Sequence, residues 1–115
     1  MILVAGGAGY IGSHVVKSLI NKNYNVVVVD NLTTGHIEAV DKRAIFVQGD
    51  LENPKDVEKV FSTYPVKGVI HFAGKCYVQE SVLHPLMYYQ ANVVSSINLL
   101  KYITAVAQTK NQFVK

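Results

Sequence analysis

The start of the chain constrains the fold most, because an apolar segment there runs directly into regularly spaced glycines. Residues 2–5 are Ile-Leu-Val-Ala, and glycine follows at Gly6, Gly9 and Gly12. A buried strand that turns sharply into a helix has this pattern, since the glycines permit the turn, let a phosphate approach the backbone and let the helix pack closely on the sheet. Unpaired N–H groups and the positive end of the helix dipole meet at such a turn, which therefore predicts a pyrophosphate site.

An acidic residue strengthens the interpretation of this turn as a dinucleotide-binding fingerprint. Asp30 follows Gly12 by 18 residues and ends a run of four valines, the position from which a carboxylate accepts the hydroxyls of an adenosine ribose. A carboxylate there repels a 2′-phosphate, and no arginine follows to hold one, so we predict NAD rather than NADP. The alternative is a glycine-rich turn that binds nothing, with Asp30 as a simple turn cap.

Size and composition are those of one globular domain over residues 1–115. The chain is 50% hydrophobic and 17% charged, and no apolar stretch approaches the roughly 20 residues that span a bilayer. Its 11 basic residues are scattered, so the net charge of +3 does not predict nucleic-acid binding. The histidines and the single cysteine, Cys76, lack metal-ligand spacing. The lone thiol and the absence of a visible secretion signal predict a cytoplasmic protein.

Strands and helices alternate along the chain, which predicts an α/β fold with a parallel sheet. We expect strands at residues 2–5, 26–30, 45–48 and 68–72, and helices at residues 10–21, 54–64 and 85–108. Asn53 and Pro54 supply an N-cap and a first helical residue for the second helix. Right-handed crossovers give the strand order 3-2-1-4, the first half of a Rossmann-type doubly wound sheet, truncated near a fifth strand that begins at Phe113 and Val114.

The apolar positions of two helices predict which of their faces are buried. The first helix is expected to turn one stripe toward the sheet, formed by Ile11, Val15, Val16, Leu19 and Ile20. The last helix has one apolar stripe, Leu86, Val93, Ile97, Leu100 and Thr104, and further apolar residues on its other faces. A helix that is apolar on more than one side is buried on more than one side. We therefore expect the chain to self-associate through this helix, through the open edge of the fourth strand, or through both. The alternative is that the helix packs inside a longer parent protein.

Ligands of a doubly wound sheet bind at the carboxyl ends of its strands. After the third strand, Asp50 and Leu51 are placed to contact adenine, although a simple turn aspartate is an equal alternative for Asp50. His71 lies in the apolar fourth strand, where a buried core histidine is expected. No catalytic triad of serine, histidine and aspartate can be assembled from the pattern.

Several short segments resemble the extended short-chain dehydrogenases and, within them, the N-terminal third of the UDP-glucose 4-epimerase family. They are residues 6–14 (Gly-Gly-Ala-Gly-Tyr-Ile-Gly-Ser-His), 30–36 (Asp-Asn-Leu-Thr-Thr-Gly-His), 49–51, 71–74 (His-Phe-Ala-Gly), 80–81, 85–89 and Asn92. The resemblance implies a tightly held NAD that oxidises C4 of UDP-glucose or UDP-galactose and returns the hydride to the opposite face. It also implies a homodimer through the helix at residues 85–108.

The same resemblance implies which residues contact NAD. They lie in the segments that end the strands and in the last helix: Gly6, Gly9, Tyr10, Ile11, Gly12, Asp30, Asn31, Thr33, Thr34, Gly35, Asp50, Leu51, Phe72, Ala73, Gly74 and Asn92. The glycine turn and the backbone of residues 10–11 would hold the pyrophosphate, residues 30–35 the adenosine ribose, and residues 50–51 adenine. Residues 72–74 would line the cofactor, with Asn92 anchoring this floor.

The chain departs from the family in its length and in one loop. None of its tyrosines has a lysine four residues later, so the family's catalytic Tyr-x-x-x-Lys is absent and no catalytic residue is expected in these 115 residues. Cys76 stands where some family members have a lysine, with Lys75 one position earlier, and Gln79 replaces a common glycine. We expect an inactive N-terminal fragment of an NAD-dependent UDP-glucose 4-epimerase. The alternatives are another nucleotide-sugar enzyme, such as a 4,6-dehydratase or uronate epimerase, and a non-catalytic dinucleotide sensor.

Overall fold

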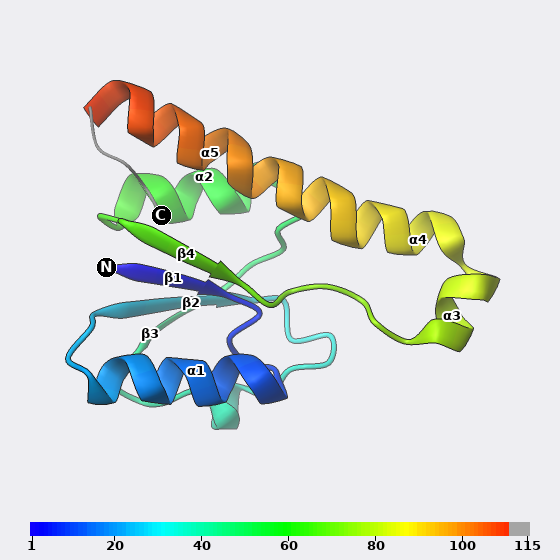
Figure 1. Ribbon diagram of the computed structural model, residues 1–115, viewed down its shortest axis with the longest axis horizontal. Helices are drawn as coiled ribbons and strands as arrows, with labels where there is room; N and C mark the ends of the chain where they lie inside the picture. Colours follow the sequence, from blue (N-terminus) through cyan, green and yellow to red (C-terminus); the bar gives the residue numbers. More distant parts are fainter. Residues whose placement is uncertain (111–115) are drawn as a thin grey trace.

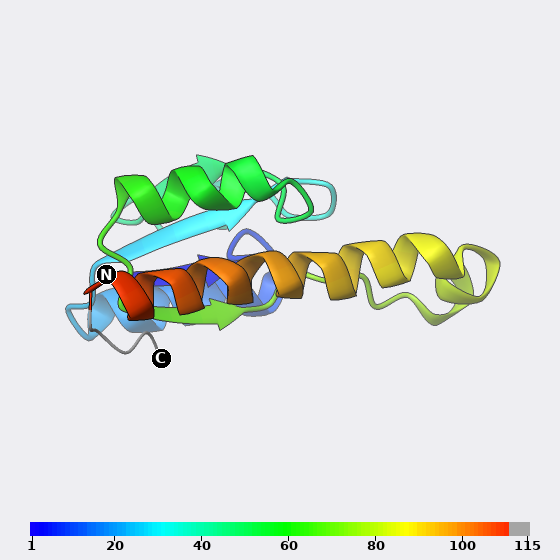
Figure 2. The ribbon, with the colours of Figure 1, turned by 90° about the horizontal axis from the view of Figure 1, so that it is seen from above.

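The protein is a three-layer α/β structure, in which one sheet lies between helices. The computed structural model describes residues 1–110, and the side chains of residues 1–107. The strands are β1 (Ile2–Ala5), β2 (Val26–Asp30), β3 (Ile45–Gln48) and β4 (Gly68–His71). Figures 1 and 2 show α1 (Tyr10–Asn21) against one face of the sheet, and α2 (Pro54–Thr63) and α5 (Ser95–Lys110) against the other.

All four strands are parallel and follow the order β3-β2-β1-β4. The register pairs Ala5 of β1 with Val29 of β2 and with His71 of β4. The predicted fold class, strand order and the bounds of the first three strands are therefore confirmed, and β4 ends one residue earlier than predicted. The predicted fifth strand at Phe113–Val114 lies outside the described residues.

The four valines of β2 divide the core between the two faces of the sheet. Val26 and Val28 pack toward α1 with Val4 and Val16, and all four are at most 3% exposed. The intervening valines pack toward α2 and α5, in the cluster that contains Leu3, Val57, Val60, Phe61 and Leu99. Alternate residues of a strand point to opposite faces, so a strand covered on both sides is apolar throughout.

The two helices flanking the first half of the sheet begin in different ways. The side chain of Asn53 accepts a hydrogen bond from the N–H of Lys55, and Pro54 follows as the first helical residue, as predicted for α2. Helix α1 begins after Gly9 without any side-chain cap. The expected burial of Ile11 is wrong, because its side chain is 63% exposed. The buried residues of α1 are Gly12, Ser13 and Val16, and of these Val16 was predicted.

The C-terminal helix is more irregular than its sequence predicts. It begins as α4 (Pro85–Tyr89), continues through a π-helical turn, η2 (Gln90–Val94), and ends as α5. A short helix, α3 (Val78–Leu83), precedes it in a segment for which no helix was expected. A 3-10 turn, η1 (Ile37–Ala39), follows the loop after β2. Within residues 1–110, no helix is long and apolar enough to cross a membrane.

Candidate dinucleotide-binding site

A cleft of about 550 Å³ opens where the carboxyl ends of the four strands meet. Ligand clefts in proteins are typically about 300–1,000 Å³. Twelve of the predicted contact residues line it: Gly6, Gly9, Asp30, Asn31, Thr33, Thr34, Gly35, Asp50, Leu51, Phe72, Ala73 and Gly74. The other four do not line it. Tyr10, Ile11 and Gly12 form the first turn of α1, and Asn92 lies behind the loop after β4.

The glycine turn approaches other backbone so closely that side chains would not fit. Gly6 has a φ of 77°, and a Cβ there would overlap the backbone of Ala73. A Cβ on Gly12 would overlap the carbonyl oxygen of Gly6 and lie 2.8 Å from Cα of Gly7. The turn therefore brings the uncapped N-terminus of α1 to the cleft, and uncapped helix N–H groups bind anions.

Asp30 ends β2 with a buried carboxylate that organises the surrounding loops. Its Oδ2 accepts the N–H of Ala8 at 3.0 Å, and its Oδ1 accepts the N–H of Leu32 at 2.9 Å. The residue is 8% exposed and lines the cleft. Each oxygen has a further lone pair, so Asp30 can join the glycine turn to the next loop and still accept a ligand hydroxyl.

The loop after β2 is built by a second polar residue. Oδ1 of Asn31 accepts both the backbone N–H and the hydroxyl of Thr33, at 3.1 and 2.8 Å. Leu32, between them, has a φ of 60°, an uncommon conformation for a residue with a branched side chain. Such strain persists where surrounding contacts enforce it, and here the hydrogen bonds of Asp30 and Asn31 do so.

The turn after β3 is held from two sides. The carboxylate of Asp56, in α2, accepts the N–H of Asp50 at 2.9 Å, and Asp50 itself accepts the N–H of Glu52. Asn98 of α5 donates its Nδ2 to the carbonyl oxygens of Leu51 and Glu52, at 2.9 and 3.1 Å. Asn98 is 5% exposed. No motif in the sequence marks this residue.

The loop after β4 lies along the C-terminal helix and is fixed by Asn92. Its Oδ1 accepts the N–H of Lys75 at 2.7 Å, and its Nδ2 donates to the Lys75 carbonyl oxygen at 3.0 Å. A Cβ on Gly74 would lie 3.1 Å from Asn92 Oδ1, so this approach requires a small residue. The anchoring predicted for Asn92 is present in these bonds, whereas its contribution to cofactor binding stays a prediction.

Further residues that were not assigned as cofactor contacts complete the cleft. They come from the strand ends, the loop after β4, and one face of the C-terminal helix: Val29, Gly49, Glu52, Lys75, Cys76, Tyr77, Glu80, Met87, Ala91 and Ser95. The helical residues of this set could have been found from their spacing. Ala91 and Ser95 are small and four residues apart, so they lie on one helix face, and small residues let a ligand approach that face.

The charge of the cleft is predominantly negative. Its acidic lining residues are Asp30, Asp50, Glu52 and Glu80, and Lys75 is the one basic residue among those that line it. An additional phosphate on the adenosine ribose would meet this negative field. Among the described residues no group of histidine, cysteine and carboxylate side chains has the arrangement of a metal site.

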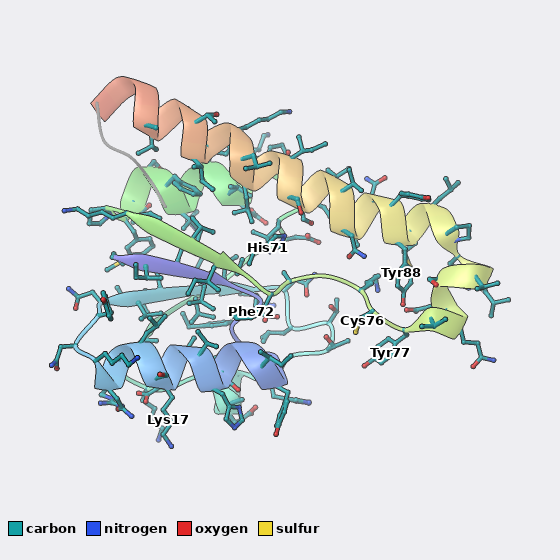
Figure 3. The ribbon with its side chains drawn as sticks, viewed as in Figure 1. Lys17, His71, Phe72, Cys76, Tyr77 and Tyr88 are labelled. Carbon is teal, nitrogen blue, oxygen red and sulfur yellow. The ribbon has the colours of Figure 1, made fainter. Side chains whose placement is uncertain are left out.

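His71 does not occupy the core position expected for it. It is exposed at the outer edge of β4, with Nε2 lying 3.2 Å from Ser96 Oγ, and Figure 3 shows it at the end of this strand. Partial burial of the ring lowers the pKa of His71. The expectation failed because β4 forms the edge of the described sheet, so only its other side is paired.

The cleft fits a dinucleotide on the evidence of its own residues. It joins an uncapped helix N-terminus, where a side chain at Gly12 would not fit, to a buried carboxylate at the end of the adjacent strand. The first is suited to a pyrophosphate and the second to a ribose diol.

Comparison with known proteins agrees with this geometry. A model of the NAD dependent epimerase/dehydratase family matches residues 2–114. The chain is 49% identical over 100 residues to UDP-glucose 4-epimerase from Lacticaseibacillus casei, a match that covers 87% of this chain and 30% of that protein. It is 45% identical over 114 residues to UDP-glucose 4-epimerase 3 from Oryza sativa subsp. japonica, covering 90% of this chain and 31% of the relative.

Solved structures show the same similarity. UDP-glucose 4-epimerase from Brucella ovis, in complex with NAD, superimposes with a TM-score of 0.85 at 42% identity, covering 96% of this chain and 33% of that one. The chain thus spans about a third of the length of the proteins it matches.

Proposed function

Because this chain belongs to the NAD dependent epimerase/dehydratase family, we propose that it binds NAD in the cleft at the carboxyl ends of its strands. The observation that carries the proposal is the carboxylate of Asp30, which lies in the cleft and is bonded to the N–H of Ala8 in the glycine turn. The loop that would hold the ribose and the turn that would hold the pyrophosphate are therefore joined through one side chain.

Each part of the cleft has a distinct role in this proposal. The turn from Gly6 to Gly12, with the backbone N–H groups of Tyr10 and Ile11, holds the pyrophosphate. Asp30 and Asn31 accept and donate hydrogen bonds at the adenosine ribose, beside Thr33, Thr34 and Gly35. Asp50 and Leu51 contact adenine, and Phe72, Ala73 and Gly74 line the nicotinamide half above the anchor formed by Asn92.

The choice of NAD over NADP is tested by calorimetry on the intact chain and on Asp30→Asn, which keeps the shape and removes the charge. Hydrogen bonds to a charged group contribute about 1.5–3 kcal/mol, so we expect NAD affinity to fall at least about tenfold and the preference over NADP to narrow. Glu38→Gln, which removes an exposed charge in η1, is the matched control and should leave both affinities unchanged. Equal affinities of the unmodified chain for NAD and NADP would contradict the role of Asp30.

For the longer proteins that contain this segment, we propose C4 epimerisation of UDP-glucose and UDP-galactose. The identity of 49% to an epimerase supports this reaction over that of a 4,6-dehydratase, a uronate epimerase or a dinucleotide sensor. Bound NAD supplies a hydride acceptor at its nicotinamide ring. Residues 1–115 alone contain no Tyr-x-x-x-Lys, so we expect them to bind cofactor without turnover. A coupled assay in which the pure chain converts UDP-galactose faster than buffer would contradict this.

We further propose that two copies associate through the outer stripe of the C-terminal helix. Leu86, Val93, Ile97 and Leu100 are 82, 47, 44 and 58% exposed, an apolar row that a monomer would leave in water. Sedimentation equilibrium should show a dimer that weakens in the double variant Ile97→Lys, Leu100→Lys. A monomer at high micromolar concentration would refute the proposal.

A further inference from the structure

Two side chains on one face of the C-terminal helix hold alternate positions of the loop after β4. Tyr88 and Asn92 are four residues apart, and side chains at this spacing lie on the same helix face. Asn92 binds both backbone polar groups of Lys75. The hydroxyl oxygen of Tyr88 accepts the N–H of Tyr77 at 3.1 Å. The helix thereby fixes the loop backbone at two points on either side of Cys76.

The bond that orients Tyr88 is short and partly buried. Its hydroxyl donates to Oε2 of Glu80 at 2.6 Å, a charge-assisted hydrogen bond, and the residue is 8% exposed. Burial, followed by the hydrogen bond to Glu80, raises the pKa of Tyr88 to about 12. The phenol therefore stays protonated and acts as donor to α3 and acceptor from the loop at the same time.

The loop segment held in this way forms one wall of the cleft. Lys75, Cys76, Tyr77 and Glu80 all line it. Figure 3 shows Tyr88 pointing from α4 toward the loop, whereas Cys76 and Tyr77 lie on the other side of it. This wall follows β4, at the opposite side of β1 from Asp30 and Asp50, which follow β2 and β3.

We propose that Tyr88, through Tyr77 and Glu80, is a positioning residue that sets the loop wall against the part of a dinucleotide beyond its adenosine. The inference rests on the proposed binding of NAD in this cleft. Tyr88 does not line the cleft, so it acts through the loop. Its loss should weaken NAD, which extends toward the wall, and leave ADP, which ends near the glycine turn, unaffected.

The test compares Tyr88→Phe with Tyr89→Phe in the intact chain. Both variants remove one hydroxyl and keep the ring, but Tyr89 is 69% exposed and lies outside the cleft. Calorimetry with NAD and with ADP measures the two parts of the site separately. Amide hydrogen exchange by NMR measures the loop itself, because the Tyr77 N–H loses its acceptor in Tyr88→Phe while the Lys75 N–H keeps Asn92.

In Tyr88→Phe we expect NAD affinity to fall about tenfold and ADP affinity to stay within twofold. The Tyr77 amide should exchange faster with solvent, whereas the amides of β1 and β2 should exchange at unchanged rates. Equal losses for NAD and ADP, or affinities equal to those of Tyr89→Phe, would overturn the inference. If the unmodified chain binds neither ligand, the proposed function fails. The role of Tyr88 in positioning the loop is then tested by amide hydrogen exchange alone. Faster amide exchange confined to residues 74–80 would support the role of Tyr88 in positioning the loop. Unchanged amide exchange would refute that role.

Discussion

Replacing Asn98 with alanine tests how the adenosine side of the cleft is supported. The amide of Asn98 is the described link between α5 and the turn after β3, and it reaches residues 46 and 47 positions earlier in the chain. Asn98→Ala removes both hydrogen bonds and keeps every other side chain of α5. The variant therefore separates the support of this turn from the packing of α5.

The size of the effect follows from the two acceptors. The carbonyl oxygen of Leu51 is in a buried hydrogen bond, and a buried acceptor left without a partner costs about 1–3 kcal/mol. The Glu52 carbonyl is only partly buried, so water replaces the lost donor and the cost is about 0.5–1 kcal/mol. Alanine is a better helix former by about half a kcal/mol. We expect a net loss of about 1–3.5 kcal/mol in the free energy of unfolding.

Urea denaturation followed by circular dichroism measures this loss, with Thr104→Ala as the matched control. Thr104 is exposed on the same helix, and its hydroxyl bonds only to carbonyl groups of that helix. The control should remain within about 0.5 kcal/mol of the unmodified chain. Calorimetry should also show weaker ADP binding in Asn98→Ala, because the turn that carries Asp50 is released.

A loss of less than about 0.5 kcal/mol in Asn98→Ala, the range of ordinary surface substitutions, would contradict this role of Asn98. So would a fall in stability of the expected size with unchanged ADP binding, measured at a temperature where both proteins are folded. The first result would mean that the two carbonyls find other partners, and the second that the turn keeps its shape without α5.

Three further predictions concern the glycine turn and the acid and alkaline limits of stability. Gly12→Ala should lower the free energy of unfolding by more than about 3 kcal/mol, because the added Cβ would overlap backbone atoms. Gly9→Ala, whose Cβ has its nearest contact at 3.4 Å, should fold normally but no longer bind NAD. Thermal melts measure the first effect and calorimetry the second. The side-chain hydrogen bond from Arg43 lowers the pKa of Asp41 from 3.8 to about 2, so the contribution of this pair to stability is present above pH 3.8 and lost as the pH falls toward 2. In Arg43→Met, the pKa of the Asp41 carboxyl, measured by NMR titration, should return toward 3.8. The raised pKa of Tyr88, about 12, means that its contribution is present below pH 10 and lost between pH 10 and about 12, and alkaline unfolding curves of Tyr88→Phe should lack this component.

Neighbouring residues carried enough information to predict the elements of the sheet. Three signals depend only on residues close together in the sequence: the valine run of β2, the cap formed by Asn53 and Pro54, and the glycines before α1. Their structural consequences can therefore be derived without coordinates. The grouping of Asp30 with the glycine turn was equally predictable, because the carboxyl ends of neighbouring parallel strands meet at one edge.

Contacts between distant segments could not be derived in this way. In the sequence, Asn98 is one of several polar residues of a helix, and its role depends on the contact of α5 with the turn at Leu51. Tyr88 is likewise one of several aromatic residues, and its role depends on its hydrogen bond to Glu80. Ile11 was assigned to the buried stripe of α1, although the rotation of that helix, set by the packing of Gly12 against the turn, leaves it in solvent.

The amino-acid order thus determined the strand order and the edge of the sheet where ligands bind, because periodicity and turn chemistry are local properties. Only the tertiary structure decided how that edge is held, through a π-helical turn, a short helix and three side chains that reach across the fold: Tyr88, Asn92 and Asn98. The physical reason is that a buried hydrogen bond depends on where two segments meet in space, and the pattern of either segment alone does not encode that meeting.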